Sequence, residues 1–525
     1  ARGDAPTQVM GGLLGALLRP GITRSLVIGL GTGSTAGWLA RVPSVERVDV
    51  VELEPAIEHV AEVMSKVNLD VMSNPKVHHY AGDGREFLLT TRERYDVIFS
   101  EPSNPYRAGI ASLFSQDFYR AALGRLRPGG IFVQWLQGYE MDANMLRTAY
   151  ATLTSVFPAV ESWHVHFADM LLISTAEPLA HDFDRMRARM AGEPYRTALA
   201  RTWGVEGAEG FYAGFLAAPS FAGAISKAAG DSINTDDRPI LEFGFARNLG
   251  RRGLIDLQDV AAMARSRGEH RVPGKGAPLD WSRVGEMQTA LSAYAEETLP
   301  DPEPRGERGA RRRIAARHSW VQGDLRRACG FWFSQGETPR SHADRLLTAE
   351  CLADAADARL PQAAAELARE QPIEAEMVVA RWHLASERPR EAAEHLMAAF
   401  HAYRQDPWVY RPLVQRTLPM AIRLAELDPA LGQRIFETLG QPFSTDMFDY
   451  PRKMARIRIA RALKSPSLCA EAFAPFEPHA PWEEHLLTFR YECYRAAKSP
   501  LTRRALRDLE TYREAAPPGM ALAGR

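Results

Sequence analysis

The sequence predicts an α/β fold with a doubly wound sheet in its amino-terminal half, followed by an all-α region. From about residue 25 to residue 175, short apolar runs alternate with amphipathic helical patterns, which is typical of a parallel sheet covered by helices on both faces. After about residue 311 the strand signals end, and Ala, Leu, Glu and Arg dominate. The chain of 525 residues is long enough for several domains with sizeable cores.

Six strands are predicted, each a short and mostly apolar run. Amphipathic patterns over 56–67 and 115–125 predict helices between them, and Arg127 to Gly130 form a stop signal before the fifth strand. The predicted strands are Ser25–Ile28, Val48–Glu52, Val77–Ala81, Asp96–Ser100, Ile131–Trp135 and Met170–Ser174.

Three parts of the chain differ in composition. Residues 1–250 are predicted to form the α/β domain, whose last segment returns to the sheet through 234–243. Residues 251–310 are rich in Arg, Gly and Pro, which predicts a linker with one short helix. Residues 311–525 are predicted to be helical. Within them, 375–407 reads as two helices of nearly tetratricopeptide (TPR) length, with an irregular bundle as the alternative.

Charge and cysteine content exclude several classes of function. The 64 Lys and Arg nearly balance the 65 Asp and Glu, so no global field recruits nucleic acid or anionic lipid. The four cysteines include no CxxC pair, which argues against a disulfide framework and against a cysteine-based zinc site. We therefore expect a reducing, cytoplasmic compartment.

The start of the chain bears on membrane attachment. The apolar stretch Val9–Leu18 is interrupted by glycines and is shorter than the roughly 20 residues that cross a bilayer. The chain opens with Ala1 and without a signal-peptide pattern, so we expect it to be processed or excised from something longer.

A glycine-rich turn is the strongest local signal. Gly29, Gly31 and Gly33 directly follow the first predicted strand and precede a helical pattern. Such a turn lets a nucleoside or amino-acid tail lie against bare backbone near unpaired N–H groups. Ser34 stands where a dinucleotide fingerprint has its third glycine, which makes NAD a poorer candidate.

Acidic residues follow the next three predicted strands. Glu52 lies at the offset where a carboxylate accepts ribose hydroxyls, and Asp83, beside Gly84, could accept the exocyclic amine of adenine. Glu101 follows the fourth strand and could take a proton from an amine or hold a cationic substrate. Each could instead cap a helix or a loop, but three at successive strand ends favour one shared site.

Together these motifs resemble the spermidine/spermine synthase (polyamine aminopropyltransferase) family, in particular bacterial members in which the domain follows membrane helices. The resemblance covers about residues 5 to 245. It rests on Thr7-Gln8, Gly29–Gly33, Val51–Glu54, Gly82–Gly84, Tyr95–Pro105, Leu113-Phe114, Phe118-Tyr119, Gly129–Gln134 and Asn234–Phe243.

The resemblance implies a Rossmann-like fold shared with methyltransferases. It also implies a donor of the decarboxylated S-adenosylmethionine or S-adenosylmethionine type, a putrescine- or spermidine-like acceptor, methylthioadenosine as by-product and no metal. A homodimer is compatible with it, and the chain would be cytoplasmic or the cytosolic part of a membrane-fused protein.

The family's roles carry over to matching positions. The glycine turn would cradle the donor, Glu52 would bind ribose, Asp83 with Gly84 would bind adenine, and Glu101 would deprotonate the attacking amine. Contacts to the substrate are expected from Gln8, Asn104, Tyr106 and Tyr139.

Three departures from the family pattern matter. Thr32 replaces an aspartate that holds the donor's ammonium group, and Asn104 replaces the second aspartate of the catalytic loop. The family's amino-terminal β-hairpin domain, which closes its active site, is not among these residues.

Two other functions remain open. One is methyl transfer from S-adenosylmethionine, although Val27 stands where many methyltransferases carry an acidic residue. The other is a non-catalytic nucleoside sensor whose helical half recruits a protein partner.

Two further features carry weaker functional signals. His164 and His166 share one face of a short strand and could hold a metal, but a surface pair is favoured. The basic run from Arg308 to Arg317 is read as a solvated face or a helix start.

Overall fold

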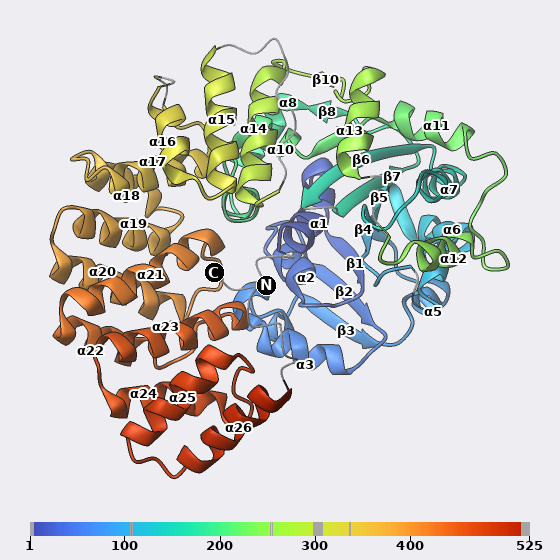
Figure 1. Cartoon of the computed structure of the whole chain (residues 1–525). Helices are drawn as coiled ribbons and strands as arrows, with labels where there is room; N and C mark the ends of the chain where they lie inside the picture. The colour runs from blue at the N-terminus through green and yellow to red at the C-terminus, as the bar shows by residue number, and fades with distance from the viewer. Residues whose placement is uncertain are drawn as a thin grey trace. The chain divides into compact units, whose positions relative to one another are not determined.

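A computed structural model gives the architecture of the chain (Figure 1). Cα packing divides it into two compact units, Ala1–Thr348 and Ala349–Arg525, each described by itself. The structure describes residues 5–105, 107, 109–166, 169–251, 254, 256–297, 308–334, 336 and 338–515.

The first unit is built on an eight-stranded mixed sheet in the order β3-β2-β1-β4-β5-β7-β6-β9. The five strands from β3 to β5 pair in parallel, whereas β7, β6 and β9 pair antiparallel. The strands are β1 (Arg24–Ile28), β2 (Arg47–Glu52), β3 (Val77–Ala81), β4 (Tyr95–Ser100), β5 (Leu126–Gln137), β6 (Ala159–His166), β7 (Asp169–Thr175) and β9 (Phe215–Ala217).

The doubly wound α/β fold is confirmed, and all six predicted strands are present. The prediction of a wholly parallel sheet is wrong at one edge. Only two residues separate β6 from β7, which is too short for the crossover that a parallel pair requires, so the two strands pair antiparallel.

Helices cover both faces of the sheet (Figure 1). On one face, α1 packs against β4 to β7 and against α2, and its Val9, Leu13 and Leu17 are fully buried. Within the described part of the chain, no helix is long and apolar enough to cross a membrane. The helices of the two layers are α1 (Ala5–Leu18) and α2 (Ser34–Ala40), opposite α5 (Gly84–Thr90), α6 (Gln116–Arg125) and α7 (Ala143–Thr154).

The segment 234–243 does not return to the sheet as predicted. The buried Asn234 side chain donates to the carbonyl oxygens of Ala111 and Phe114, at 3.2 and 3.0 Å, and accepts from the N–H of Leu241 at 3.1 Å. These bonds fasten the turn before helix α12 (Ile240–Asn248) to the 3₁₀ helix Ile110–Phe114, and the segment continues as α12 instead of pairing with a strand.

The predicted linker contains two helices, α13 (Leu257–Ser266) and α14 (Trp281–Tyr294), rather than one short helix. The basic run begins helix α15 (Arg308–Val321), which confirms a helix start. A solvated face is wrong for its later half, because Arg313 and Arg317 are fully buried. They pair with Glu286 of α14 and with Asp344, each through a 2.7 Å contact.

Residues 298–307, in the predicted linker, lie outside the described part. The predicted domain boundaries near 250 and 310 stay predictions, because compactness alone does not define a folding domain.

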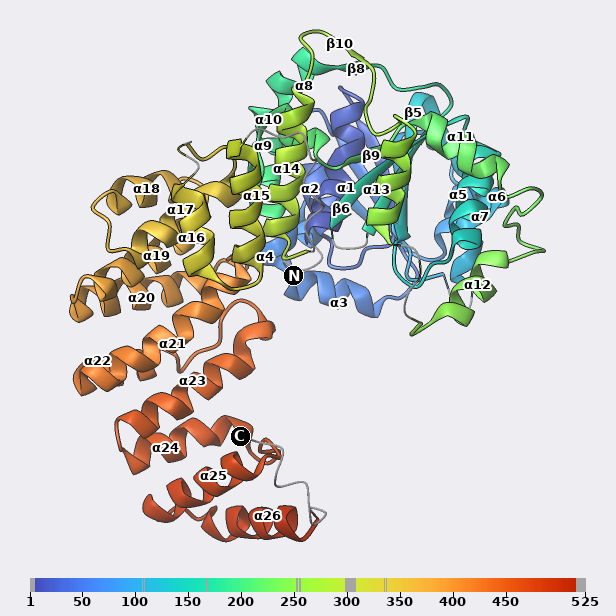
Figure 2. The ribbon, with the colours of Figure 1, turned by 45° about the horizontal axis from the view of Figure 1, so that its top comes forward.

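The second unit consists of helices in which each packs against its neighbours along the chain (Figure 2). The predicted pair around Pro389 is confirmed as helices α19 and α20, whereas its TPR-like character stays a prediction. The helices are α18 (Leu360–Leu367), α19 (Pro372–Ala385), α20 (Pro389–Tyr403), α21 (Arg411–Leu427), α22 (Pro429–Thr438), α23 (Asp449–Ala462), α24 (Pro466–Phe473), α25 (Glu484–Ala496) and α26 (Thr502–Ala515).

The cysteines contradict the predicted absence of disulfides. Cys469 and Cys493, on α24 and α25, are bonded to each other with Cα atoms 5.6 Å apart. Cys329 and Cys351 are disulfide-bonded as well. Sequence spacing missed this because tertiary packing brings distant cysteines together. The cysteines therefore give no support for a reducing compartment, and the cytoplasmic location stays a prediction.

Candidate functional site

A cavity of about 700 Å³ opens at the carboxyl ends of β1 to β4 and at the start of β7. Its lining joins several segments that are distant in sequence. The lining residues are Thr7, Gln8, Ile28, Gly29, Gly31, Val51, Glu52, Leu53, Glu54, Ile57, Asp83, Gly84, Glu101, Pro102, Ser103, Arg107, Gly109, Ile110, Ser112, Leu113, Trp135 and Asp169. Glu52, Asp83 and Glu101, from three different strand ends, thus share one hollow.

The glycine turn forms one wall of the cavity. Gly29 has a φ of +98°, and a Cβ atom there would lie 2.5 Å from the carbonyl oxygen of Glu101, so only glycine lets the two backbones approach. Gly31 also lines the cavity, beside Gln8. Gly33 does not: it is buried against Asn68 and Val71.

Asn68 supports this turn from behind, and the sequence analysis missed it. Its side chain is fully buried and donates to the carbonyl oxygens of Thr32 and Ala61, at 2.8 and 2.7 Å. Its backbone carbonyl also lies so close to α2 that a Cβ on Gly37 would stand 1.8 Å away. A lone Asn in a helical pattern carries no signal of such a role.

Glu52 is anchored by backbone donors. One carboxylate oxygen accepts the N–H of Leu30 at 2.8 Å, and the other accepts the N–H of Glu54 at 2.9 Å. Glu52 thereby fixes the glycine turn to the end of β2. Each carboxylate oxygen has more than one lone pair, so the group can still accept hydrogen bonds from a ligand in the cavity.

Asp83 caps helix α5, as its alternative reading predicted, and it also lines the cavity. Its Oδ1 accepts the N–H of Arg85 at 2.7 Å and that of Glu86 at 3.4 Å. The Arg85 side chain pairs with Asp236 at 2.7 Å, and this hydrogen bond lowers the pKa of the Asp236 carboxyl.

Glu101 extends β4 beyond its last residue. Its N–H donates to the carbonyl oxygen of Ile28 at 3.0 Å, which places it beside the glycine turn. One carboxylate oxygen accepts the buried hydroxyl of Thr35 at 2.7 Å. The carboxylate is therefore held against α2 while it lines the cavity.

Of the expected substrate contacts, the structure brings one to the cavity. Gln8 lines it and accepts a hydrogen bond from the Thr32 hydroxyl. Asn104 and Tyr139 are not among the lining residues; the Asn104 amide donates to Tyr139 at 2.8 Å and to Gln137. Tyr106 lies outside the described residues.

Several lining residues were not among the expected site residues, and three of them belong to elements beside the strand ends. Thr7 is buried on α1, Trp135 lies on β5, and Asp169 begins β7. The Thr7 hydroxyl donates to Asp169 at 2.6 Å. Thr7 belonged to a recognised motif, but no sequence pattern connected it with a carboxylate 162 positions away.

The histidine pair is not a surface pair. His164 and His166 side chains are 16% and 18% exposed, and each lies 3.5 Å from a carboxylate oxygen of the buried Glu297. No group of three or more metal-ligating side chains was found among the residues that the structure describes.

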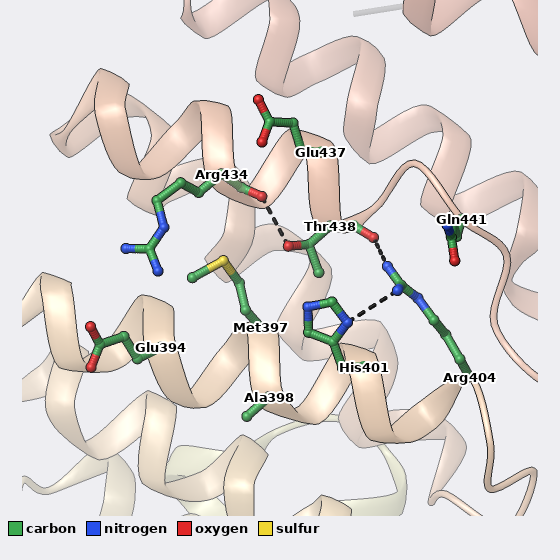
Figure 3. A pocket seen from close by; sticks show the side chains of 9 residues that line it. All are labelled: Glu394, Met397, Ala398, His401, Arg404, Arg434, Glu437, Thr438 and Gln441. Atoms are coloured by element: carbon green, nitrogen blue, oxygen red, sulfur yellow. Dashed lines mark hydrogen bonds between the residues drawn. The ribbon is translucent and has the colours of Figure 1, made fainter.

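The helical unit has a cavity of its own, of about 630 Å³, between α20 and α22 (Figure 3). Arg404 links the two helices, because its guanidinium contacts His401 at 3.0 Å and the carbonyl oxygen of Thr438. The lining carries both signs of charge, including Glu394 and Arg434. A protein partner for this unit stays a prediction.

The mixed sheet, with the glycine turn after β1, defines a methyltransferase-like α/β fold. Residues 10–167 match the model of the spermine/spermidine synthase domain.

Curated relatives match about a third of the chain or less. The polyamine aminopropyltransferase of Nitrosomonas europaea is 29% identical over 175 residues, which cover 32% of this chain and 54% of the relative. That of Alkaliphilus metalliredigens is 34% identical over 146 residues, or 27% and 51% of the two chains. The chain thus spans about half the length of the curated relatives it matches.

Two solved structures were also compared. Spermidine synthase from Thermotoga maritima has a TM-score of 0.30 and 20% identity, covering 32% of this chain and 60% of that one. Human methyltransferase-like protein 13 with SAH has a TM-score of 0.28 and 23% identity, covering 33% and 82%.

Proposed function

We propose that the α/β unit is a polyamine aminopropyltransferase-like enzyme. It transfers an aminopropyl group from decarboxylated S-adenosylmethionine to an amine and releases methylthioadenosine. The observation that carries the proposal is the single cavity that gathers the glycine turn, Glu52, Asp83 and Glu101. The aminopropyltransferase relatives support it over the matched region.

In this mechanism Glu52 accepts hydrogen bonds from the ribose hydroxyls, and a carboxylate oxygen of Asp83 accepts one from the adenine amine. The donor sulfonium then lies over Gly29 and Gly31. The acceptor nitrogen attacks the aminopropyl carbon, the C–S bond breaks, and its electron pair stays on sulfur. Glu101, held by Thr35, takes the proton that the nitrogen loses.

Glu101→Gln tests the assignment. The amide cannot accept the amine proton but nearly preserves the shape, so we expect turnover to fall by about 100-fold or more. Calorimetric affinity for the donor should change by less than about threefold. Unchanged turnover would remove Glu101 from the role of base.

Methyl transfer is the second candidate. Thr32 places a hydroxyl, rather than a carboxylate, near Gln8 at the glycine turn, so a donor that keeps its own carboxylate meets less repulsion there. Product analysis with both forms of the donor and with putrescine and spermidine separates the two reactions. Nucleoside binding without any product would favour a non-catalytic, nucleoside-sensing function.

A further inference from the structure

Arg107 is the single cationic side chain among the described residues that line the cavity, where it accompanies five carboxylates. We propose that Arg107 binds a carboxylate of the acceptor, and that the acceptor is an amino acid whose terminal amine is the nucleophile. This inference rests on the proposed function and names its acceptor class: an amine that also carries a carboxylate, as ornithine does, instead of a plain diamine.

The Arg107 guanidinium is available to a ligand. In the part of the chain that the structure describes, this side chain is exposed and takes part in no hydrogen bond or ion pair. The nearby carboxylates are held by other donors: Glu101 accepts the hydroxyl of Thr35 at 2.7 Å, and Asp169 accepts that of Thr7 at 2.6 Å. Pairing within the fold therefore does not account for a cation at this position.

The turn that carries Arg107 lies on the acceptor side of the cavity. The N–H of Arg107 donates to the carbonyl oxygen of Asn104 at 3.1 Å, a hydrogen bond between residues three apart, as in a β-turn. The Asn104 amide in turn donates to Gln137, the last residue of β5. The residues proposed to bind the nucleoside follow β1, β2 and β3, which lie on the opposite side of β4 in the sheet. A carboxylate held by Arg107 therefore belongs to the acceptor.

The loop after β4 differs in charge from that of the family that the sequence resembles. Asn104 replaces an aspartate, which removes one negative charge, and Arg107 adds a positive charge three positions later. Residues 101–107 thus carry one negative and one positive charge, at Glu101 and Arg107. An acceptor with an amine at one end and a carboxylate at the other complements this pattern, whereas a dication does not.

The remaining charges of the cavity select a carboxylate over a phosphate. A guanidinium presents its donors in a planar fork that matches either anion. The five lining carboxylates repel a phosphate, which carries nearly two negative charges, more strongly than a single carboxylate. In an amino acid that carboxylate is also offset by the ammonium groups of the same molecule.

In the proposed complex the acceptor bridges Arg107 and Glu101. Its carboxylate binds the guanidinium, and its terminal amine lies at Glu101. The neutral amine nitrogen attacks the aminopropyl carbon of the donor, an N–C bond forms, and the C–S bond breaks with its electron pair left on the sulfur of methylthioadenosine. The proton that the nitrogen loses goes to Glu101. The product is an N-aminopropyl amino acid that retains its carboxylate.

The test compares L-ornithine with putrescine, which lacks only the carboxylate, at saturating decarboxylated S-adenosylmethionine. We expect the KM of wild type for ornithine to be at least about tenfold below that for putrescine, as for one hydrogen bond between charged groups. Arg107→Gln should raise the KM for ornithine about 10- to 100-fold and change that for putrescine by less than about twofold.

Two further variants control for indirect effects. Arg107→Lys keeps the charge and should recover most of the affinity for ornithine. Arg92 is exposed just before β4 and does not line the cavity, so Arg92→Gln should leave both KM values unchanged.

Three results would overturn the proposal. Equal losses for both amines in Arg107→Gln would assign the residue a structural role in its loop. A wild-type enzyme that uses ornithine no better than putrescine would show that no carboxylate is recognised. Weaker binding of S-adenosylmethionine by Arg107→Gln, with an unchanged KM for ornithine, would place the recognised carboxylate on the donor.

Failure of the proposed function is distinguishable. If wild type forms no product from any amine, calorimetry of ornithine on the protein saturated with methylthioadenosine replaces the kinetics. Binding that Arg107→Gln weakens at least tenfold would support the amino-acid site without aminopropyl transfer. Absence of ornithine binding to wild type, or equal binding by the variant, would overturn it.

Discussion

Replacing Glu52 by Gln tests whether the same carboxylate both holds the glycine turn and binds the nucleoside. In the wild type the carboxylate accepts two backbone N–H bonds, of 2.8 Å from Leu30 and 2.9 Å from Glu54. A glutamine has only one oxygen, and its NH₂ group cannot accept from a backbone N–H. The variant therefore loses one of these bonds and the anionic acceptor for ribose.

A hydrogen bond to a charged group contributes about 1.5–3 kcal/mol, so the Kd for methylthioadenosine should rise about 10- to 150-fold. The free energy of unfolding should fall by about 1.5–3 kcal/mol, because the turn loses one hydrogen bond to the charged carboxylate. Isothermal calorimetry measures the first quantity and urea denaturation the second.

The matched control is Glu62→Gln. Glu62 is a carboxylate on α3 (Ala56–Val63) whose side chain is 62% exposed and which does not line the cavity. This variant should bind methylthioadenosine as the wild type does. If Glu52→Gln also kept its affinity within twofold while remaining folded, Glu52 would be only a turn anchor, and the nucleoside site would have to lie elsewhere.

Two further predictions concern a cap and a buried histidine. Asp83→Asn keeps an oxygen for the N–H groups of α5, so its free energy of unfolding should change by less than about 0.5 kcal/mol, whereas that of Asp83→Ala should fall by about 1 kcal/mol. Both variants should bind methylthioadenosine more weakly than wild type. Wild-type affinity in both variants would show that Asp83 acts only as a helix cap. Burial and the charges of Arg345 and Arg196 lower the pKa of His342 to about 3. The unfolded histidine, with a pKa of about 6.5, takes up the proton first, so the free energy of unfolding should decrease as the pH falls from about 6.5 towards 3, by on the order of 5 kcal/mol in full. Urea denaturation at several pH values should show a shallower decrease for His342→Gln, and identical slopes would contradict the assignment.

Local sequence predicted the parallel half of the sheet well, because its strands are short, mostly apolar runs followed by turn signals. It predicted the antiparallel edge less well. β6 contains Glu161, Ser162 and two histidines, and their burial depends on partners that come from later segments. The same limit applies to Arg313 and Arg317. Their charge predicts exposure to solvent, and only the tertiary structure shows that they pair with Glu286 and Asp344.

The candidate site divides in the same way. Gly29, Glu52, Asp83 and Glu101 could be selected from the sequence because each directly follows a recognisable strand, and the carboxyl ends of parallel strands meet at one edge. Asn68, Thr7 and Asp169 could not, because each acts through a contact with a residue far away in the chain.

What the amino-acid order alone determined is the α/β class, the glycine turn and the succession of acidic strand ends, since all three depend on periodicity and near neighbours. Tertiary structure decided which carboxylates share the cavity, which are held by buried hydroxyls, and that Asn104 is directed to Gln137 and Tyr139 instead of lining it. These outcomes depend on strand order and on side-chain packing between segments that lie from 33 to 162 residues apart in the chain, and no local pattern records them.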